Sequence, residues 1–215
     1  MPDVPEIAPE EGWPQGLRLL RGFLSPAERE ALLGGVVAAL PGCPFFRPRM
    51  PRWGTPFSVR MLNFGPLGWV SDKSGYRYQP HHPDTGRPWP PMPEMLPSLW
   101  RRLDLWPAPP QAALVNHYAP GARMGLHVDA DEEEMDAPIL SISLGCDAAF
   151  RIGGPRRGDR TTTIRLRAGD VLIMGGLARR CYHGVDRIFP GTGQLPGAIG
   201  EGRINITLRR VSRAA

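Results

Sequence analysis

The second half of the chain, from Ala112 onward, alternates short apolar runs with glycine, proline and aspartate. Runs bounded by such turn-forming residues are typical of β-strands. They read AALVNHY, PILSISLG, AAFRIGG, TTTIRLRAGD, DVLIMGG and RINITLRRV. Many short strands at close spacing favour a β-sandwich or a jelly-roll barrel, so we expect a mainly β fold with flanking helices.

The first of these helices is predicted at SPAEREALLGGVVAAL, residues 25–40. Ser25 is placed to act as its N-cap, Pro26 lies in its first turn, and Glu28 completes a capping box. Pro41 cannot continue a helix and is expected to end this one. We expect it to have a structural role.

A proline-dense stretch follows at residues 79–110. Its middle, EMLPSLWRRLDLW, predicts one short helix with Pro97 in the first turn. The remainder is expected to form a long ordered loop, and such loops are often functional. His81 and His82 lie in this loop. Adjacent loop histidines are more often surface residues than ligands, so we expect no ligand role for them.

The closing strand RINITLR, 203–209, separates polar from apolar side chains. Because successive side chains of a strand point to opposite faces, Arg203, Asn205, Thr207 and Arg209 share one face and three aliphatic residues share the other. The apolar face must pack against the protein, so the polar face lines either solvent or a wet cavity. Two arginines beside an asparagine are also suited to bind a small dicarboxylate.

Composition indicates an ordinary soluble globular protein, since 41% of the 215 residues are hydrophobic and 22% are charged. This length suits one well-buried domain with an elaborated N-terminal part. No apolar run approaches the roughly 20 residues that cross a bilayer. The acidic, proline-rich start MPDVPEIAPEEGWPQG resembles neither a secretory signal nor a transit peptide. We therefore expect a cytoplasmic protein without a membrane partner.

Charge and cysteine content narrow the picture only slightly. The net charge is +5 and Lys73 is the single lysine, so the basic residues are almost all arginines, which pair well with phosphates and stack on bases. This excess permits a nucleic-acid partner without requiring one. Cys43, Cys146 and Cys181 form no C-x-x-C pair, which favours free thiols in a reducing compartment.

Three residues could form a metal site. If GLHVDAD is extended, His127 and Asp129 lie on the same face, and CYHGVDR supplies a distant second histidine, His183. Two histidines and one carboxylate make the facial triad that holds Fe(II) and leaves positions open for a chelating co-substrate and dioxygen. Zinc competes for the same ligands. The nearby strand with two arginines favours iron.

With these motifs in place, the chain resembles the AlkB family of Fe(II)- and 2-oxoglutarate-dependent dioxygenases. The resemblance rests on segments that run in order along nearly the whole chain beyond the acidic start. These are SVRMLNFGPLGWVSDKSGYRY, PWPPMP, LVNHYAPGARMGLHVDADE, APILSISLG, GDVLIMGG, YHG and RINITLR. It implies a double-stranded β-helix (jelly-roll) core with an N-terminal nucleotide-recognition lid.

The resemblance also implies roles for individual residues. His127, Asp129 and His183 would bind Fe(II) and carry the catalysis, with 2-oxoglutarate as co-substrate and O2 as oxidant. Arg203 would bind the distal carboxylate of 2-oxoglutarate, and Arg209 would lie near the carboxylate that also binds iron. The residues expected to hydrogen-bond the same co-substrate are Asn116, Tyr118 and Asn205.

Family members of this type oxidise N-alkyl lesions such as 1-methyladenine and 3-methylcytosine in DNA, and often in RNA. An extruded base needs flat surfaces, and Trp69 and Tyr76 occupy the positions that the resemblance assigns to this task. Asp131 and Arg157 match residues that contact the lesion or its surroundings. A carboxylate such as Asp131 would favour a cationic alkylated base over a neutral one.

We therefore expect one compact unit with three parts: a flexible tail at 1–12, an N-terminal helix and lid at 13–111, and the jelly-roll core at 112–215. Its expected activity is oxidative demethylation of alkylated DNA, single- or double-stranded, with release of formaldehyde, by a monomer. Two alternatives stay open. One is a 2-oxoglutarate-dependent enzyme acting on methylated RNA or another substrate, and the other is a non-catalytic metal-binding module that recognises alkylated nucleic acid.

Overall fold

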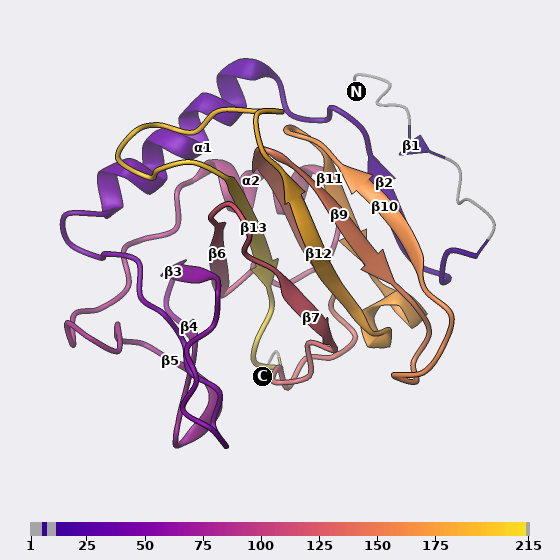
Figure 1. Cartoon of the computed structure of the whole chain (residues 1–215), viewed down its shortest axis with the longest axis horizontal. Helices are drawn as coiled ribbons and strands as arrows, with labels where there is room; N and C mark the ends of the chain where they lie inside the picture. The colour runs from indigo at the N-terminus through magenta and orange to yellow at the C-terminus, as the bar shows by residue number, and fades with distance from the viewer. Residues whose placement is uncertain (1–5, 8–11, 214–215) are drawn as a thin grey trace.

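The computed structural model describes residues 6–7 and 12–213. Its strands form two sheets that face each other, with a separate two-stranded hairpin beside them (Figure 1). The larger sheet has the strand order β1-β2-β11-β8-β13-β6-β3 and the smaller has the order β10-β9-β12-β7. This arrangement confirms the mainly β, jelly-roll expectation.

The larger sheet is built mainly from the closing strand and its neighbours. Its strands are β1 (Glu6–Ile7), β2 (Leu17–Leu20), β3 (Arg60–Phe64), β6 (Ala112–Tyr118), β8 (Ile139–Gly145), β11 (Val171–Met174) and β13 (Arg203–Arg209). Strand β13 lies between β6 and β8 and pairs antiparallel with both. Buried leucines, isoleucines and valines from these strands dominate the hydrophobic core. Every residue of β13 is buried, so its polar face lies inside the protein.

The smaller sheet covers the other side of the cavity. Its strands are β7 (Met124–His127), β9 (Asp147–Ile152), β10 (Thr162–Leu166) and β12 (His183–Phe189). Strands β7 and β12 were not predicted from the hydrophobic pattern. In their paired register His183 stands opposite His127, which brings both histidines to the same end of the sheet.

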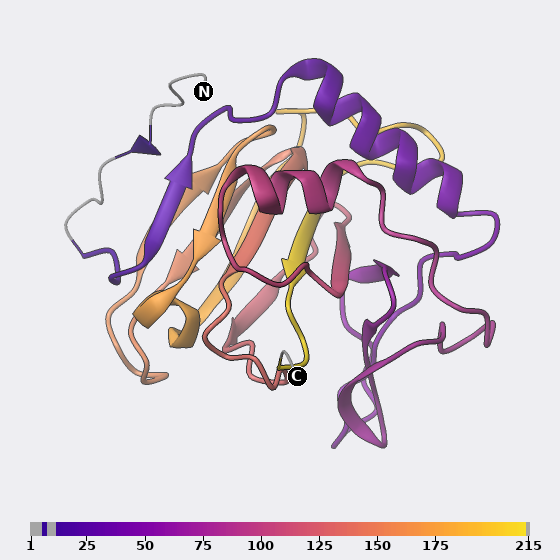
Figure 2. The ribbon, with the colours of Figure 1, turned by 180° about the vertical axis from the view of Figure 1, so that it is seen from behind.

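Residues before Ala112 contribute to both the sheet and its surroundings. Strand β2 pairs with β11, and β3 pairs with β6, so this part of the chain supplies strands at both edges of the larger sheet. The hairpin consists of β4 (Gly68–Asp72) and β5 (Gly75–Gln79) and projects away from the two sheets (Figures 1 and 2). Of the predicted tail, residues 6–7 form β1, and residues 1–5 and 8–11 lie outside the described part of the chain.

Both predicted helices are present. Helix α1 (Pro26–Ala39) begins with the expected capping box between Ser25 and Glu28 and ends just before Pro41. Helix α2 (Met95–Arg102) is shorter than the predicted segment and lies behind the larger sheet in Figure 1 and in front of it in Figure 2. A short 3₁₀ helix, η1 (Gly176–Arg180), precedes β12. Among the described residues, no helix has the length and apolar character needed to cross a membrane.

That neither loop histidine is a ligand stays a prediction, but His82 is not a surface residue. Its side chain is buried, with Nε2 2.8 Å from the carbonyl oxygen of Pro44, while Nδ1 accepts a hydrogen bond from the backbone N–H of Asp84. The ring also packs against Trp89. His82 is therefore a structural residue that fixes the proline-dense loop, whereas His81 is exposed as expected.

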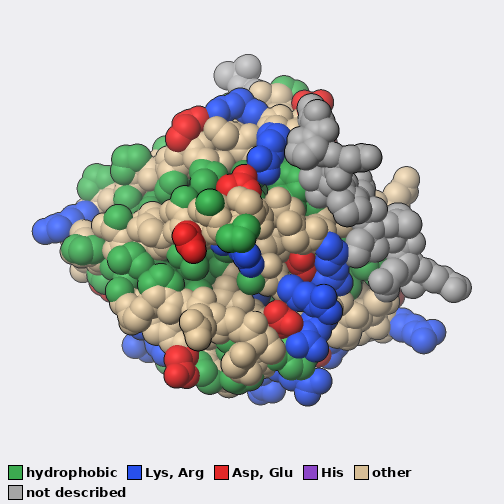
Figure 3. All heavy atoms as spheres, turned by 90° about the horizontal axis from the view of Figure 1, so that it is seen from above, with side chains coloured by type: hydrophobic (Ala, Val, Ile, Leu, Met, Phe, Trp, Pro, Cys, Tyr) green, Lys and Arg blue, Asp and Glu red, His purple; other side chains and the backbone are tan. Residues whose placement is uncertain are grey.

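The surface seen from above carries charges of both signs (Figure 3). Arginine and lysine side chains gather on one part of this face, close to carboxylates, and apolar side chains cover much of the opposite part. Such mixing agrees with a net charge of only +5.

Candidate functional site

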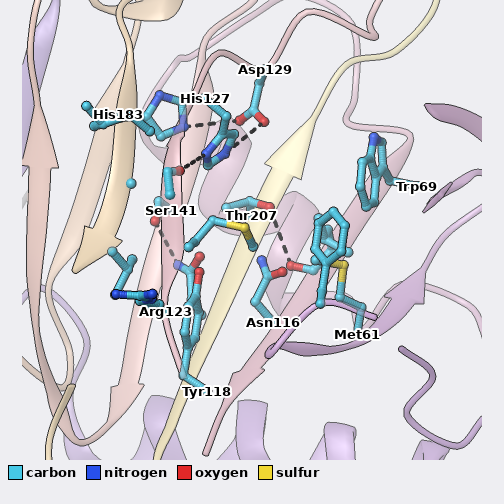
Figure 4. A pocket seen from close by; sticks show the side chains of 18 of the residues that line it. Met61, Trp69, Asn116, Tyr118, Arg123, His127, Asp129, Ser141, His183 and Thr207 are labelled. Carbon is cyan, nitrogen blue, oxygen red and sulfur yellow. Dashed lines mark hydrogen bonds and ion pairs between the residues drawn. The ribbon is translucent and has the colours of Figure 1, made fainter. Parts of the chain in front are cut away.

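A cavity of about 740 Å³ opens between the two sheets and under the β4–β5 hairpin. It contains all twelve of the site residues predicted from the sequence. These are His127, Asp129, His183, Asn116, Tyr118, Arg203, Asn205, Arg209, Trp69, Tyr76, Asp131 and Arg157. Figure 4 shows the histidines and Asp129 at one end of this cavity, Tyr118, Asn116 and Arg123 towards the other, and Trp69 along its side.

Candidate metal ligands

The two histidines face Asp129 from neighbouring strands of the smaller sheet. His127 Nε2 lies 3.7 Å from Asp129 Oδ1, and His183 Nε2 lies 3.5 Å from Asp129 Oδ2. One ligand atom from each of the three residues lies within 4.8 Å of the other two. One metal ion can bridge atoms at this spacing, since metal–nitrogen and metal–oxygen bonds are about 2.0–2.2 Å long.

Backbone carbonyls orient both imidazole rings. His127 Nδ1 lies 2.9 Å from the carbonyl oxygen of Gly125, and His183 Nδ1 lies 3.0 Å from that of Cys181. A carbonyl accepts only from an N–H, so each Nδ1 carries the proton and each Nε2 presents its lone pair towards Asp129. This is the tautomer that a metal-binding histidine needs.

Close strand approach explains a glycine beside His183. A Cβ atom on Gly184 would lie 2.6 Å from the carbonyl oxygen of Met124 and 2.9 Å from that of Gly125. Glycine at this position therefore allows β12 to approach β7 and keeps the two histidines together.

Charges around Asp129 keep its carboxylate ionised. Burial alone would raise its pKa, but the guanidinium of Arg209 is the main opposing influence, and the pKa lies well below its usual range. Burial and the neighbouring His183 lower the pKa of His127, which favours its neutral, metal-binding form. The donor set of two imidazoles and one carboxylate fits a divalent first-row metal.

Two different arginines

Arg203 is buried and offers hydrogen-bond donors to the cavity. One of its nitrogens, Nη2, donates to Ser143 Oγ at 2.9 Å. Its Nε and Nη1 have no hydrogen-bond partner among residues 6–7 and 12–213, and we call them the open donors of Arg203. Burial lowers the pKa of this arginine. A buried guanidinium of this kind is costly unless an anion binds it, which fits the carboxylate of a ligand.

The Tyr118 ring lies beside Arg203, with the guanidinium carbon 5.5 Å from the ring centroid. Burial raises the pKa of Tyr118 to about 12, so its hydroxyl remains a hydrogen-bond donor. Asn116 also faces the cavity, and its Oδ1 has no partner within the described part of the chain. Asn205 instead donates from Nδ2 to Ser141 Oγ at 2.8 Å, which ties β13 to β8.

Arg209, in contrast, pairs with protein carboxylates. Its Nη2 lies 2.9 Å from Asp129 Oδ2, and its Nη1 lies 2.7 Å from Glu132 Oε1. Glu132 also accepts hydrogen bonds from Tyr78 Oη and from Arg179 Nη2, the latter at 2.8 Å. The four side chains form a buried network that supports Asp129, and we call it the Glu132 network.

Sequence reasoning missed the Glu132 network. Glu132 begins an acidic run next to Asp131, which is usually a solvated surface feature, and Arg179 lies 47 residues away in sequence. The involvement of Ser141 and Ser143 could have been found, because they alternate with aliphatic residues in PILSISLG as β13 residues do.

The aromatic wall

Trp69 forms one wall of the cavity mouth and is held from three directions. Its backbone N–H donates to Asn63 Oδ1 at 3.1 Å, and its indole Nε1 donates to Asp131 Oδ2 at 2.7 Å. Tyr76 stacks on it with ring centroids 5.7 Å apart and an angle of 17° between the ring planes. Arg157 lies in the turn between β9 and β10, with its guanidinium carbon 5.9 Å from the centroid of the Tyr182 ring.

A flat aromatic wall close to a candidate metal site suits a planar ligand. Tyr76 is 46% exposed, so the stack lies at the edge of the cavity and not in the core. The Asp131 carboxylate adds a negative charge at this edge. The cavity can therefore hold a small dicarboxylate near Arg203 and a flat, cationic group near Trp69.

Similar proteins

The family model of the 2OG-Fe(II) oxygenase superfamily matches residues 16–209. An alpha-ketoglutarate-dependent dioxygenase AlkB homolog from Caulobacter vibrioides is 49% identical over 93% of this chain and 89% of its own length. The alpha-ketoglutarate-dependent dioxygenase AlkB of Escherichia coli is 36% identical over 96% of this chain and 97% of its own. Among solved structures, that of OsALKBH1 has a TM-score of 0.79 at 28% identity and covers 96% of this chain and 100% of its own.

Proposed function

The chain belongs to the 2OG-Fe(II) oxygenase superfamily and, within it, to the AlkB family of 2-oxoglutarate-dependent dioxygenases, and on this premise we propose that it removes alkyl groups oxidatively from the bases of nucleic acid. Its cofactor is Fe(II), and its co-substrates are 2-oxoglutarate and O2. The preferred substrate in this proposal is DNA that carries N-methylated bases such as 1-methyladenine or 3-methylcytosine.

One observation carries the proposal. The same cavity contains a pair of histidines with a carboxylate, a buried arginine with open donors, and a solvent-edge aromatic wall. Each part has a counterpart in the reaction, namely the metal, the dicarboxylate co-substrate and the base. A protein that bound alkylated bases without chemistry would need the wall but neither of the other two.

His127, Asp129 and His183 would hold Fe(II) in this proposal. When bound with 2-oxoglutarate, the iron supplies the oxidation by O2 that hydroxylates the N-alkyl group, which then leaves as an aldehyde. The carbonyls of Gly125 and Cys181 hold both imidazole rings in the binding tautomer. The Glu132 network keeps Arg209 against Asp129, so the carboxylate remains ionised and fixed in place.

Arg203 would bind a carboxylate of 2-oxoglutarate through its open donors, and the hydroxyl of Tyr118 lies on the same side of the cavity. A buried ion pair between the Arg203 guanidinium and this carboxylate would orient 2-oxoglutarate relative to the metal ligands. Asn116 could supply a further hydrogen bond, because rotation of its amide presents either the oxygen or the NH₂ group.

Trp69 and Tyr76 would receive the extruded base, and Asp131 would favour a base made cationic by alkylation. The hydrogen bond between Asp131 and the Trp69 indole fixes the wall and orients the carboxylate with it. Arg157, from the turn between β9 and β10, also lines this cavity. The lesion would thereby be recognised by shape and by charge together.

The test is formaldehyde release from a single-stranded deoxyoligonucleotide containing 1-methyladenine, with Fe(II), ascorbate and 2-oxoglutarate. We expect release to require every component and to vanish in His127→Ala, while His81→Ala, which alters an exposed histidine outside the cavity, retains it. A methylated RNA of the same sequence distinguishes the two nucleic-acid substrates. Consumption of 2-oxoglutarate without formaldehyde from either polymer would rule out the substrate assignment but leave the oxygenase intact.

A further inference from the structure

A second aromatic surface lies outside the cavity, in the segment between α1 and β3. Trp53 is 69% exposed, more than any other large hydrophobic residue of the described chain. The guanidinium carbon of Arg52 lies 4.5 Å from the centroid of the Trp53 ring. Trp53 therefore presents a flat apolar ring to solvent with a positive charge beside it.

The turn that carries Trp53 is held rigidly. Arg49 and Pro56 form a bridge across it, Met50 N–H donates to the Thr55 carbonyl at 2.9 Å, and Arg49 Nη1 donates to the Gly54 carbonyl at 2.9 Å. Gly54 adopts a φ of 66°, in the left-handed region that closes the turn and favours glycine. The exposure of Trp53 is therefore a feature of an ordered turn.

The same turn is hydrogen-bonded to the β4–β5 hairpin. Ser71 of β4 accepts a hydrogen bond from Arg49 N–H through its carbonyl at 2.9 Å and donates from Oγ to the Arg49 carbonyl at 2.6 Å. Figures 1 and 2 show the segment between α1 and β3 running along the β4–β5 hairpin, away from the two sheets. Tyr76, half of the aromatic wall, points its hydroxyl at Met50 Sδ, 4.0 Å away.

Trp53 also lies close to the mouth of the cavity. Met50 and Pro56, three residues to either side of it, both line the cavity. Since a chain spans at most about 3.6 Å per residue, the Trp53 Cα lies within roughly 11 Å of each of them. A nucleic-acid strand that leaves the cavity on the side of Met50 and Pro56 therefore passes near this ring with its next nucleotides.

The charge of the segment fits such a strand. Residues 47–60 contain four arginines and no acidic residue. Burial and then the nearby charge of Arg47 lower the pKa of Arg60. Combined positive charge and aromatic stacking is how proteins bind single-stranded nucleic acid without reading its sequence.

We propose that Trp53, assisted by Arg52, is a stacking platform for an unpaired base that neighbours the extruded one on the same strand. This inference rests on the proposed function and names the part of the substrate that Trp53 would contact, an unpaired base next to the extruded one. A base still paired in a duplex cannot offer its face to the ring without unstacking from its own neighbours, which costs a few kcal/mol per step.

The experiment compares KM for a methylated pentadeoxynucleotide in wild type, Trp53→Ala, Trp53→Phe and, as a matched change of an exposed apolar residue elsewhere, Leu177→Ala. Stacking of one base predicts a rise in KM of roughly tenfold for Trp53→Ala with little change in kcat. Trp53→Phe should recover most of the affinity, and Leu177→Ala should behave as wild type.

A second substrate separates stacking from simple damage to the turn. In this oligonucleotide the nucleotides that flank the lesion are abasic. The wild type should show the same rise in KM that Trp53→Ala shows on the normal oligonucleotide, and the mutation should add nothing further. If Trp53→Ala raised KM for the abasic oligonucleotide as much as it does for the normal one, the proposal would be overturned, because the ring would then contribute to binding without a base to stack on.

Two other outcomes decide between this inference and its premise. Turnover of the normal pentamer that Trp53→Ala leaves unchanged would refute the platform and leave the proposed function standing. Absence of turnover in wild type on any alkylated polymer would remove the premise itself. If Trp53→Ala instead converted a dimer to a monomer in sedimentation, the ring would be a contact between two copies of the chain and the proposal would be wrong.

Discussion

Two arginines at the same face of one strand have different environments. Arg203 and Arg209 are separated by six positions on β13 and are both buried, yet Arg209 is neutralised by Asp129 and Glu132. Arg203 instead donates to the Ser143 hydroxyl, and its open donors have no carboxylate partner among the described residues. Spacing on the strand predicted that both would face the cavity, but their partners come from distant segments and could not be read from the strand.

Arg203→Met tests the role of the open donors. A buried ion without a counterion destabilises the protein, so we expect the ligand-free variant to melt at the same temperature as wild type or higher. Affinity for 2-oxoglutarate should fall by about 2–5 kcal/mol, which is thirtyfold or more. Titration of 2-oxoglutarate against melting temperature gives both values. Arg210→Met is the control. This residue directly follows β13 and does not line the cavity, so the variant should bind the co-substrate normally.

His117 provides a prediction about acid stability. Its Nδ1 accepts hydrogen bonds from Arg60 and its Nε2 lies 3.0 Å from the Glu201 carbonyl, an arrangement that requires the neutral ring. Burial, together with the charges of Arg60 and Arg47, lowers its pKa. Folding therefore disfavours protonation, and the stability present above the ordinary value near 6.5 is lost as pH falls through the lowered pKa.

We expect the free energy of unfolding to decline between pH 7 and pH 5, and His117→Asn to be less stable overall but to show a shallower decline. Urea unfolding at several pH values measures both slopes. Parallel curves for the two proteins would show that another group is responsible.

At the scale of elements, the segment between β7 and β8 connects the β4–β5 hairpin to the site. Glu132 in this segment contacts Tyr78 of β5, Arg179 of η1 and Arg209 of β13. Burial would raise the pKa of Glu132, but Arg209 and Arg179 outweigh it and lower the pKa, so the carboxylate is ionised. One side chain thus joins three elements that are far apart in sequence.

Glu132→Gln should be strongly destabilising, because it removes the carboxylate that pairs with the buried Arg179 and leaves Arg209 with Asp129 alone. Loss of one partner from a buried ion pair costs about 3–5 kcal/mol. Chemical denaturation measures this cost, and Glu133→Gln, which changes the exposed neighbour, should have almost no effect. Equal stability of the two variants would mean that the Glu132 network contributes little to folding.

The hydrophobic pattern predicted both helices and six strands, each from a run whose period or capping residues are local. From Ala112 onward it missed β7 and β12, in which Gly125 and Gly184 interrupt the apolar pattern, and at Gly184 a Cβ would collide with the neighbouring strand. It also gave no sign that His82 is buried, because the hydrogen bond between this ring and the Pro44 carbonyl depends on tertiary contacts. Predictions therefore failed where distant segments, and not local sequence, decide the environment.

At the scale of the whole molecule, the site depends on both sheets. The candidate metal ligands come from the smaller sheet and the segment that follows β7, whereas Arg203 and Asn116 come from the larger one. Ligands that contact both sheets should therefore stabilise the entire fold, since binding to the native state alone shifts the unfolding equilibrium.

Iron together with 2-oxoglutarate, under anaerobic conditions, should raise the melting temperature. At a ligand concentration one hundred times Kd the gain is about 2.7 kcal/mol, or roughly 5–10 °C for a protein of this size. His127→Ala should lose this response and His81→Ala should keep it. A full response in His127→Ala would show that the metal binds elsewhere.

The carbonyls that orient His127 and His183 belong to the backbone, each two residues before its histidine. A main-chain oxygen is present whichever side chain the residue carries, so changes in the surrounding side chains leave this part of the metal geometry intact. The walls of the cavity can therefore diversify during evolution, or in a laboratory selection, while the imidazole orientation is inherited unchanged. Such separation makes the site a favourable starting point for engineering new substrate preferences without rebuilding its metal chemistry.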